Sequence, residues 1–226
     1  MFTHFLFDCD GVILNSNSIK TDGFFFATKS FGEENSLKLV NYHKLNGGIS
    51  RYKKFEYFIK NILKIPFSDS LYKKLLDKYS KYIFSELIKS DLANNIKENR
   101  KKFNKSKWFI VSGGDEKELR LVFRERNLDY LFDGGIYGSP KNKLEILENI
   151  LVEKENLSEC IFLGDALYDY QAAKSFGINF RYITKWSEFK NIYNHAKENK
   201  VITHPDIQSF FEDIQGYDPD SQRFCK

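Results

Sequence analysis

Short apolar runs occur at intervals along this chain, and five of them have the length and flanking residues of buried β-strands. They are Phe5–Phe7, Trp108–Val111, a weaker Gly135–Tyr137, Cys160–Leu163 and Asn179–Ile183. Amphipathic helical patterns lie between the later runs. Strands that alternate with helices are typical of a parallel sheet with crossover helices. The sequence therefore predicts an α/β fold around a parallel sheet.

Three helices are predicted after the second strand. The first starts at Asp115, whose side chain can cap it while Glu118 completes a capping box. The second carries apolar residues at helical spacing within residues 144–151. The third runs from about Ala166 to Phe176 and ends at Gly177, where a helix stop is expected.

The interval between the first two strands is much longer than a crossover requires. More than 100 residues separate Asp8 from Ser112, whereas a simple strand–helix–strand unit needs about 30. Residues 15–94 have a strongly helical pattern, with Pro66–Asp69 as a separator between two helices. We therefore predict a discontinuous core of residues 1–14 and 95–226, with a helical lid domain inserted at residues 15–94.

Composition places the chain among ordinary soluble globular proteins. Its 226 residues are 42% apolar and 29% charged, and the formal net charge of +4 is too small to indicate nucleic-acid binding. The most basic stretch, Lys97 to Lys107, contains Glu98 and little aromatic interleaving, which favours a solvated helix face or linker.

Cysteine usage and hydropathy favour a cytoplasmic protein without a membrane partner. Cys9, Cys160 and Cys225 are odd in number and lack metal-ligand spacing, which suits a reducing compartment. Only seven residues precede Asp8, too few for a signal peptide, and no apolar window approaches membrane-spanning length. The polar end of the chain, from Gly216 on, is expected to be loosely ordered.

Two aspartates directly follow the first strand. Asp8 and Asp10 stand one residue apart, just before Gly11. A carboxylate at the end of a buried strand is costly to desolvate unless a cation or hydrogen-bond donors compensate it. Mg²⁺ prefers such hard oxygen ligands. The alternative is a strand followed by an ordinary Asp-Gly turn.

A second polar corner follows the second strand. Ser112, Gly113 and Gly114 precede the helix predicted at Asp115. A hydroxyl, two glycines and a helix amino end together can bind phosphate. An ordinary strand-to-helix turn is the alternative interpretation.

Further candidates lie at the later strand ends. Asp165 closes the fourth strand and Asp169 comes one helical turn later, so both could share a face of the helix they begin. Metal coordination explains both acids, whereas capping explains only Asp165. The loop after the third strand delivers Lys141 and Lys143 to the start of a helix.

The order of these motifs resembles the haloacid dehalogenase superfamily over essentially the whole chain. The sequence has DxDG at Asp8, a serine at Ser112, a lysine at a helix start, and GDxxxD at Asp165. The resemblance is to C1-capped members of the phosphoglycolate phosphatase and β-phosphoglucomutase branch. It implies a Rossmann-like sheet with an inserted helical cap, and a magnesium-dependent phosphatase acting on a small phosphorylated metabolite.

The resemblance also implies roles for individual residues. Asp8 would be the nucleophile that forms an aspartyl-phosphate, and Asp10 the general acid and base. Mg²⁺ would be held by Asp8, the Asp10 backbone carbonyl and Asp165, with Asp169 in support. Ser112, Gly113 and the lysine would bind the phosphate. The family's loop form favours Lys143 over Lys141.

Within the cap, Gly47–Arg51 resembles the substrate-specificity loop of β-phosphoglucomutase-type members. Ser50 and Arg51 would then lie near the substrate, with Arg51 gripping a second anionic group. A solvent-facing arginine is the alternative. Asn15 departs from the aspartate of many relatives, but lies outside the four motifs.

Several other functions compete with the phosphatase. A phosphomutase shares the same chemistry, and a non-catalytic binding domain would keep only a vestigial site. A phosphonate hydrolase is disfavoured because no cap lysine stands out as placed for Schiff-base chemistry. A dehalogenase is disfavoured because those members lack the aspartate found here as Asp10. The sequence does not specify the substrate or the oligomeric state.

Overall fold

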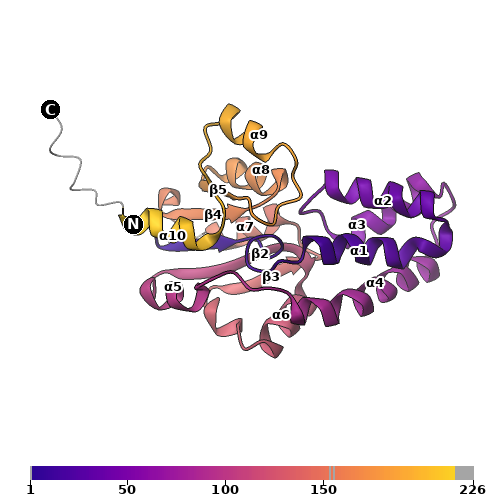
Figure 1. Cartoon of the computed structure of the whole chain (residues 1–226), viewed down its shortest axis with the longest axis horizontal. Helices are drawn as coiled ribbons and strands as arrows, with labels where there is room; N and C mark the ends of the chain where they lie inside the picture. Colours follow the sequence, from indigo (N-terminus) through magenta and orange to yellow (C-terminus); the bar gives the residue numbers. More distant parts are fainter. Residues whose placement is uncertain (1, 153, 155, 217–226) are drawn as a thin grey trace.

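The computed structural model describes residues 2–152, 154 and 156–216, and shows a parallel sheet with helices on both faces and further helices at one end (Figure 1). In this part of the chain, six parallel strands form one sheet in the order β3-β2-β1-β4-β5-β6. The strands are β1 His4–Phe7, β2 Lys107–Asp115, β3 Gly135–Ser139, β4 Cys160–Gly164, β5 Asn179–Ile183 and β6 Thr203–His204.

All five predicted strands are present, and the α/β fold class is confirmed. The sequence missed β6, because a strand of two residues is too short to carry a periodic pattern. It also ended β2 too early, since pairing with β3 continues to Asp115 and Ser139 after an irregularity in register. The polar end was expected to be loosely ordered from Gly216 on. Gly216 is the last residue of α10, and residues 217–226, which include Cys225, lie outside the described residues.

Helices occupy most of the remaining chain. They are α1 Asn17–Thr28, α2 Glu33–Leu45, α3 Arg51–Tyr57, α4 Asp69–Lys89, α5 Ile96–Lys102, α6 Glu116–Glu125, α7 Lys143–Leu151, α8 Leu167–Phe176, α9 Ile192–Glu198 and α10 Ile207–Gly216. A short π-helix, Phe58–Ile62, continues α3. The predicted stop of α8 is confirmed, because Gly177 has the left-handed conformation with a φ of 66°.

The strands alternate side chains between two apolar layers. In β1, Phe5 and Phe7 belong to one cluster, with residues of α5, α6 and α10, while Leu6 belongs to the other, with residues of α7, α8 and α9. This two-residue period follows from strand geometry, in which successive side chains point to opposite faces. Both faces of the sheet are therefore covered, as a parallel sheet requires.

Helices α1–α4 lie together at one end of the molecule and form what we call the helical insertion (Figure 1). The chain enters it beside the point where it returns: Leu14 forms an isolated bridge with Leu92, and the Asn15 side chain donates to Asp91. The helical insertion therefore meets the sheet through two adjacent segments. None of the helices in the described ranges is both long enough and apolar enough to cross a membrane.

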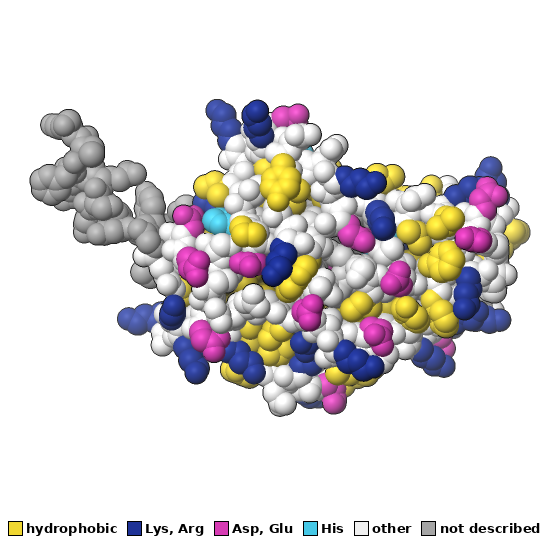
Figure 2. Space-filling view, in the orientation of Figure 1, with side chains coloured by type: hydrophobic (Ala, Val, Ile, Leu, Met, Phe, Trp, Pro, Cys, Tyr) yellow, Lys and Arg dark blue, Asp and Glu magenta, His cyan; other side chains and the backbone are white. Residues whose placement is uncertain are grey.

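The surface carries charges of both signs. On the face shown in Figure 2, acidic and basic side chains are interspersed over the sheet region and the helical insertion. Residues 97–102 of the basic stretch lie in α5, and the lysines of the stretch are exposed, whereas Arg100 pairs with Asp133 at 2.9 Å. The exposed lysines match the solvated helix face that the sequence predicts.

Candidate active site

The site forms where the strand order reverses. β2 lies on one side of β1 and β4 on the other, and ligands of open α/β sheets bind at such a reversal, beyond the carboxyl ends of the strands. Asp8 follows β1 and Asp165 follows β4, while Asp169 lies in the first turn of α8. One carboxylate oxygen from each lies within 4.8 Å of the others, and all three residues are buried.

The sequence predicted that Asp165 and Asp169 share a helix face, and this detail is wrong. Helix α8 begins only at Leu167, so Asp165 lies in the segment before it. Asp169 instead accepts a hydrogen bond from the Ala166 backbone at 3.0 Å, which caps the helix start. The two carboxylates still meet because the segment turns sharply between strand and helix.

A fully buried lysine joins the three carboxylates. Lys143 Nζ lies 3.0 Å from Asp8 Oδ1 and forms a direct ion pair with Asp169. Helix α7 begins at Lys143 because the Asn142 side chain accepts from the helix amino end and Glu145 completes a capping box. Lys141 is exposed. Of the two lysines that the sequence offered, Lys143 is the one that reaches the carboxylates.

The electrostatics of this cluster favour a further cation. Burial, followed by repulsion from Asp169 and Asp10, raises the pKa of Asp8 to about 7 despite the nearby Lys143. Burial and the proximity of Asp8 hold the pKa of Asp165 well above its usual range. Lys143 pairs with Asp8 and Asp169, whereas Asp165 accepts from the neutral Asn17 side chain, so three buried carboxylates have one ammonium group among them. This donor set fits a hard divalent cation such as Mg²⁺.

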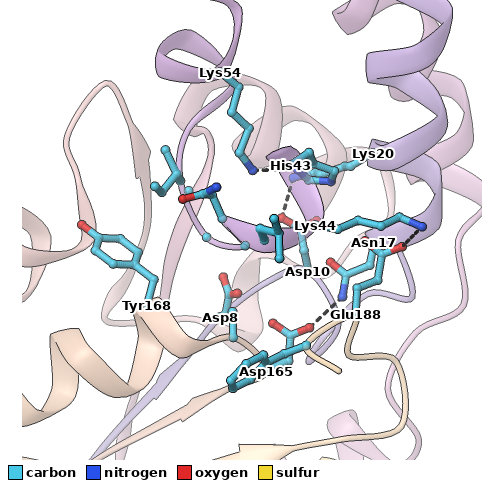
Figure 3. A pocket seen from close by; sticks show the side chains of 18 of the residues that line it. Asp8, Asp10, Asn17, Lys20, His43, Lys44, Lys54, Asp165, Tyr168 and Glu188 are labelled. Carbon is cyan, nitrogen blue, oxygen red and sulfur yellow. Dashed lines mark hydrogen bonds and ion pairs between the residues drawn. The ribbon is translucent and has the colours of Figure 1, made fainter. Parts of the chain in front are cut away.

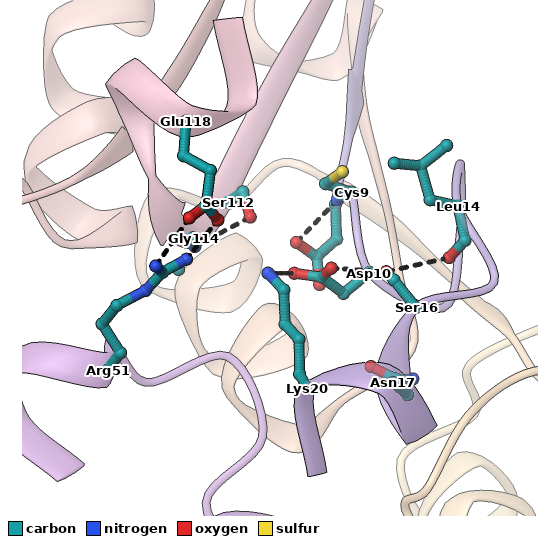
Figure 4. A network of polar contacts seen from close by, with 12 residues as sticks. Cys9, Asp10, Leu14, Ser16, Asn17, Lys20, Arg51, Ser112, Gly114 and Glu118 are labelled. Carbon is teal, nitrogen blue, oxygen red and sulfur yellow. Dashed lines mark hydrogen bonds and ion pairs between the residues drawn. The ribbon is translucent and has the colours of Figure 1, made fainter. Parts of the chain in front are cut away.

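Asp10 points away from this cluster toward its own partners. Its carboxylate accepts from Ser16 Oγ at 2.5 Å and from Lys20 Nζ at 2.5 Å (Figure 4). Burial acts to raise the pKa of Asp10, but Lys20 and the two hydrogen bonds outweigh it and leave this pKa below its ordinary value. The predicted site did not include Lys20, because nothing distinguishes it among the 35 basic residues of the sequence.

Gly11 is required by the close approach of Asp165. A β-carbon on Gly11 would lie 2.2 Å from Asp165 Oδ2, and the residue has a φ of +79°. The same carboxylate oxygen accepts from Asn17 Nδ2 at 2.7 Å. The glycine after the first aspartate pair therefore lets the two strand ends come together.

The predicted phosphate corner lies beside these carboxylates. Ser112 is buried, and its Oγ accepts from the Gly114 backbone at 3.0 Å. Gly113 and Gly114 line the cavity described below. A β-carbon on Gly113 would lie 2.1 Å from the Gly48 carbonyl oxygen, so the loop of the helical insertion packs directly on this corner.

A cavity of about 280 Å³ separates the sheet from the helical insertion. Asp8, Asp10 and Asp165 enter it from the sheet side, and His43 and Lys54 enter it from the helical insertion (Figure 3). Lys54 is buried on α3 and its Nζ lies 2.6 Å from His43 Nδ1. Nothing in the sequence distinguishes Lys54 from the other lysines of residues 15–94, and only the folded arrangement of α2 and α3 does so.

Arg51 is buried, so the solvent-facing alternative is wrong. Its guanidinium donates to both carboxylate oxygens of Glu118 on α6, at 2.5 and 2.8 Å, and to Ser80 Oγ (Figure 4). The predicted capping box is only half present. Asp115 caps α6 by accepting from the Glu118 backbone, but the Glu118 carboxylate pairs with Arg51 and does not complete the box. Ser50 caps α3, with its Oγ 3.5 Å from the Lys53 backbone nitrogen.

Comparisons with known proteins agree with this geometry. A family model described as haloacid dehalogenase-like hydrolase matches residues 2–177. A comparison with curated proteins gave no significant sequence match.

Solved structures share the fold at low sequence identity. A predicted phosphatase from Clostridium acetobutylicum is 16% identical, with a TM-score of 0.72, over 96% of this chain and 100% of that one. A protein described as a candidate phosphoglycolate phosphatase from Lactobacillus plantarum has a TM-score of 0.68 at 16% identity, covering 94% and 99%. A predicted phosphoglycolate phosphatase from Haemophilus somnus has a TM-score of 0.61 at 20% identity, covering 81% and 85%.

Proposed function

The chain belongs to the haloacid dehalogenase-like hydrolase family, and from this premise we propose that it is a magnesium-dependent phosphatase. Its substrate is a small phosphorylated metabolite, hydrolysed through an aspartyl-phosphate on Asp8. The observation that carries this proposal is the buried group of Asp8, Asp165 and Asp169 around Lys143 at the strand reversal. Structural neighbours described as phosphatases support the same reaction class.

Asp8 is the proposed nucleophile. One of its oxygens is engaged by Lys143 and by the Cys9 backbone N–H at 2.8 Å, which fixes the orientation of the carboxylate. The other oxygen would attack phosphorus and form the acyl-phosphate bond as the alcohol leaves. Water would then attack the same phosphorus and release inorganic phosphate, which restores the Asp8 carboxylate.

Asp10 is the proposed general acid and base. Asp10 stands two positions after Asp8 in the sequence, and hydrogen bonds from Ser16 and Lys20 hold its carboxylate in place. As a carboxylate it can accept the proton of the attacking water, and the carboxylic acid so formed can protonate the leaving alkoxide of the next substrate. Lys20 therefore fixes the position and the charge of the group that moves the proton.

Ser112, Gly113 and Lys143 are the proposed phosphate ligands. A hydroxyl, a backbone amide and an ammonium are donors suited to phosphoryl oxygens whose charge changes in the transition state. Asp169 positions Lys143 through their buried ion pair. The phosphoryl group would thus be held between Ser112 and Gly113, near the carboxyl end of β2, and the start of α7.

Asp8, the Asp10 backbone carbonyl and Asp165 would hold Mg²⁺, with Asp169 in support. The ion supplies positive charge that lowers the repulsion between the Asp8 carboxylate and the phosphate dianion. The raised pKa values of Asp8 and Asp165 support this assignment, because buried carboxylates without a cation are poorly compensated.

We further propose that residues 15–94 act as a cap domain on a core of residues 1–14 and 95–226. The cavity between them and the packing of Gly48 on Gly113 support this division. A cap that closes over the carboxylates would exclude bulk water and select the substrate by shape and charge. The buried free thiols of Cys9 and Cys160 are compatible with a reducing compartment such as the cytoplasm.

Release of inorganic phosphate tests the proposal. The assay uses an aryl phosphate and a panel of sugar phosphates and short phosphorylated acids, with magnesium and with chelator. Magnesium-dependent release supports the phosphatase, whereas transfer of the phosphoryl group to a second sugar hydroxyl without release supports the mutase. No turnover of any ester by folded, magnesium-loaded protein contradicts both reactions and leaves the vestigial-site alternative.

A further inference from the structure

The proposed chemistry leaves one buried cation of the cavity unused. Lys54 lies on α3, is 1% exposed, and lines the cavity from the side opposite Asp8 and Asp165 (Figure 3). Its Nζ lies 5.6 Å from the ring centre of Phe24 on α1. A buried ammonium normally has a carboxylate partner, because desolvation of the charge is costly.

The other basic side chains around the cavity have such partners. Lys20 pairs with Asp10 at 2.5 Å, Lys44 with Glu188 at 3.7 Å, and Arg51 with Glu118 at 2.5 Å. Among the described residues, no carboxylate lies within ion-pair distance of Lys54. Arg51, which the sequence had suggested as the anion-binding residue of the cap, is thus already engaged, while Lys54 is not.

Lys54 instead has a neutral partner. Its Nζ lies 2.6 Å from His43 Nδ1, and burial together with Lys54 itself holds the pKa of His43 well below its usual range. An uncharged imidazole accepts one hydrogen bond from the ammonium and so fixes its position. It supplies no negative charge, and the positive charge of Lys54 is left for a ligand to compensate.

The surroundings of Lys54 are predominantly unfavourable for its charge. Burial and the positive charge of Lys20 lower the pKa of Lys54 to about 7, with Asp10 and Glu188 offsetting this in part and Lys143 adding to it. His43, from α2, faces it as a neutral acceptor. An anion placed against Nζ would therefore bind with uptake of a proton and would raise this pKa again.

We propose that Lys54, positioned by His43, is a specificity residue that binds a carboxylate at the non-phosphorylated end of the substrate. The substrate is then a small phosphomonoester of a hydroxy acid. A single ammonium beside a neutral imidazole matches one carboxylate, and a cavity of about 280 Å³ suits a molecule of a few carbons. This inference rests on the proposed phosphatase function and names the substrate class of the same site.

Matched pairs of esters test the proposal. Phosphoglycolate is compared with 2-hydroxyethyl phosphate, and 3-phosphoglycerate with glycerol 3-phosphate, because each pair differs only by a carboxylate in place of a hydroxymethyl group. The wild-type protein should prefer the carboxylate member of at least one pair in kcat/KM. Lys54→Met should lower kcat/KM for that member about 10- to 150-fold, the usual range for a charge-assisted contact, mainly through KM.

Controls separate this effect from a general defect. Lys54→Met should change turnover of an aryl phosphate and of the hydroxymethyl esters by less than about threefold, and it should fold, because a buried apolar side chain replaces a buried charge. Lys73→Met removes an exposed lysine of α4 in the same helical insertion and should change neither member of a pair. Lys54→Gln, a polar uncharged variant, should show the same selective loss as Lys54→Met.

Direct binding gives a second measurement. Titration of the preferred carboxylate ester into the Asp8→Asn variant, in buffers of different ionisation enthalpy near pH 8, should show proton uptake that Lys54→Met abolishes.

Aryl phosphate turnover without a carboxylate preference, or a preference that survives in Lys54→Met, would overturn the assignment of Lys54 while leaving the phosphatase intact. Absence of turnover on every ester would remove the proposed function and this inference with it.

Discussion

Arg51 of α3 and Glu118 of α6 form a buried bidentate ion pair that joins the helical insertion to the sheet region. The side chains are only 3% and 9% exposed, and the guanidinium also lies 4.6 Å from the ring centre of Tyr79. The helix that begins after the phosphate corner thus contacts the helix that carries Lys54. This pair therefore fixes α3 of the helical insertion against α6 of the sheet region.

The Arg51–Glu118 pair should be structural. Glu118→Ala should lower the free energy of unfolding by about 3–5 kcal/mol, because it leaves a buried guanidinium without its carboxylate. Urea unfolding measures this. Arg120→Ala, which removes an exposed pair on the same helix, should cost less than about 1 kcal/mol.

A double substitution sharpens this test. Arg51→Met combined with Glu118→Met should recover most of the loss, since no buried charge is then unpaired. If Arg51 served the substrate instead, Glu118→Ala would free it and lower KM for anionic esters. Near-wild-type stability of Glu118→Ala together with such a lower KM would contradict the structural role.

The assignment of Asp8 as nucleophile predicts the effect of Asp8→Asn. This variant keeps the side-chain shape but removes the attacking carboxylate, so phosphate release should fall by about 10⁴-fold or more. The circular dichroism spectrum and the unfolding midpoint should show a folded protein. More than a tenth of the wild-type rate in a folded variant would exclude Asp8 as the nucleophile.

A metal at the carboxylate cluster should stabilise the native state. At a magnesium concentration about 100 times Kd, binding contributes about 2.7 kcal/mol, which corresponds to a rise in Tm of roughly 5–10 °C for a chain of this size. Asp165→Asn should abolish most of the rise, whereas Asp206→Asn, distant from the cluster in sequence and located before α10, should retain it. Equal midpoints with magnesium and with chelator, along with chelator-insensitive activity, would count against a metal site.

Lys20 should act through Asp10. Lys20→Met leaves the Asp10 carboxylate with Ser16 as its hydrogen-bond partner and without a paired cation. Because general acid–base catalysis contributes about 10²–10⁴-fold, we expect kcat to fall roughly 10- to 100-fold with little change in KM. Lys29→Met, just past the end of the same helix, is the matched control. A change confined to KM would indicate that Lys20 binds substrate instead.

Lys54 should make stability depend on pH. Its pKa is lowered from 10.5 to about 7 in the folded protein, so between these values the unfolded chain binds more protons than the native state. The contribution of Lys54 should therefore increase the free energy of unfolding as pH rises from about 7 toward 10, by up to about 1.4 kcal/mol per pH unit. Urea unfolding of wild type and Lys54→Met at several pH values measures this gain. The free energy of unfolding of the wild type should increase relative to that of Lys54→Met as pH rises from about 7 toward 10. A constant difference would contradict a buried, neutral Lys54 at high pH.

Local patterns in the sequence were sufficient for much of this molecule. The existence of five of the six strands, the cap of α6 by Asp115 and the stop of α8 at Gly177 depend on neighbouring residues, and each was predicted. Asp8 and Asp165 could be placed at one edge of the sheet because each follows a parallel strand, and the family resemblance added Asp169 to them as one group. These features need no knowledge of which helix packs on which.

Partners of long side chains depended on tertiary structure. Glu118 was predicted to complete a local capping box, yet it pairs with Arg51, 67 positions away in the sequence. Nothing in the sequence distinguishes Lys54 from the other lysines. In the folded protein it lines the cavity and its Nζ contacts His43 of α2. The sequence alone determined most of the elements, β6 excepted, and which acids follow the strands, because those depend on short-range patterns. Only the packing of the helical insertion decided which charges are buried, paired or left facing the cavity, because burial and pairing depend on contacts between distant segments.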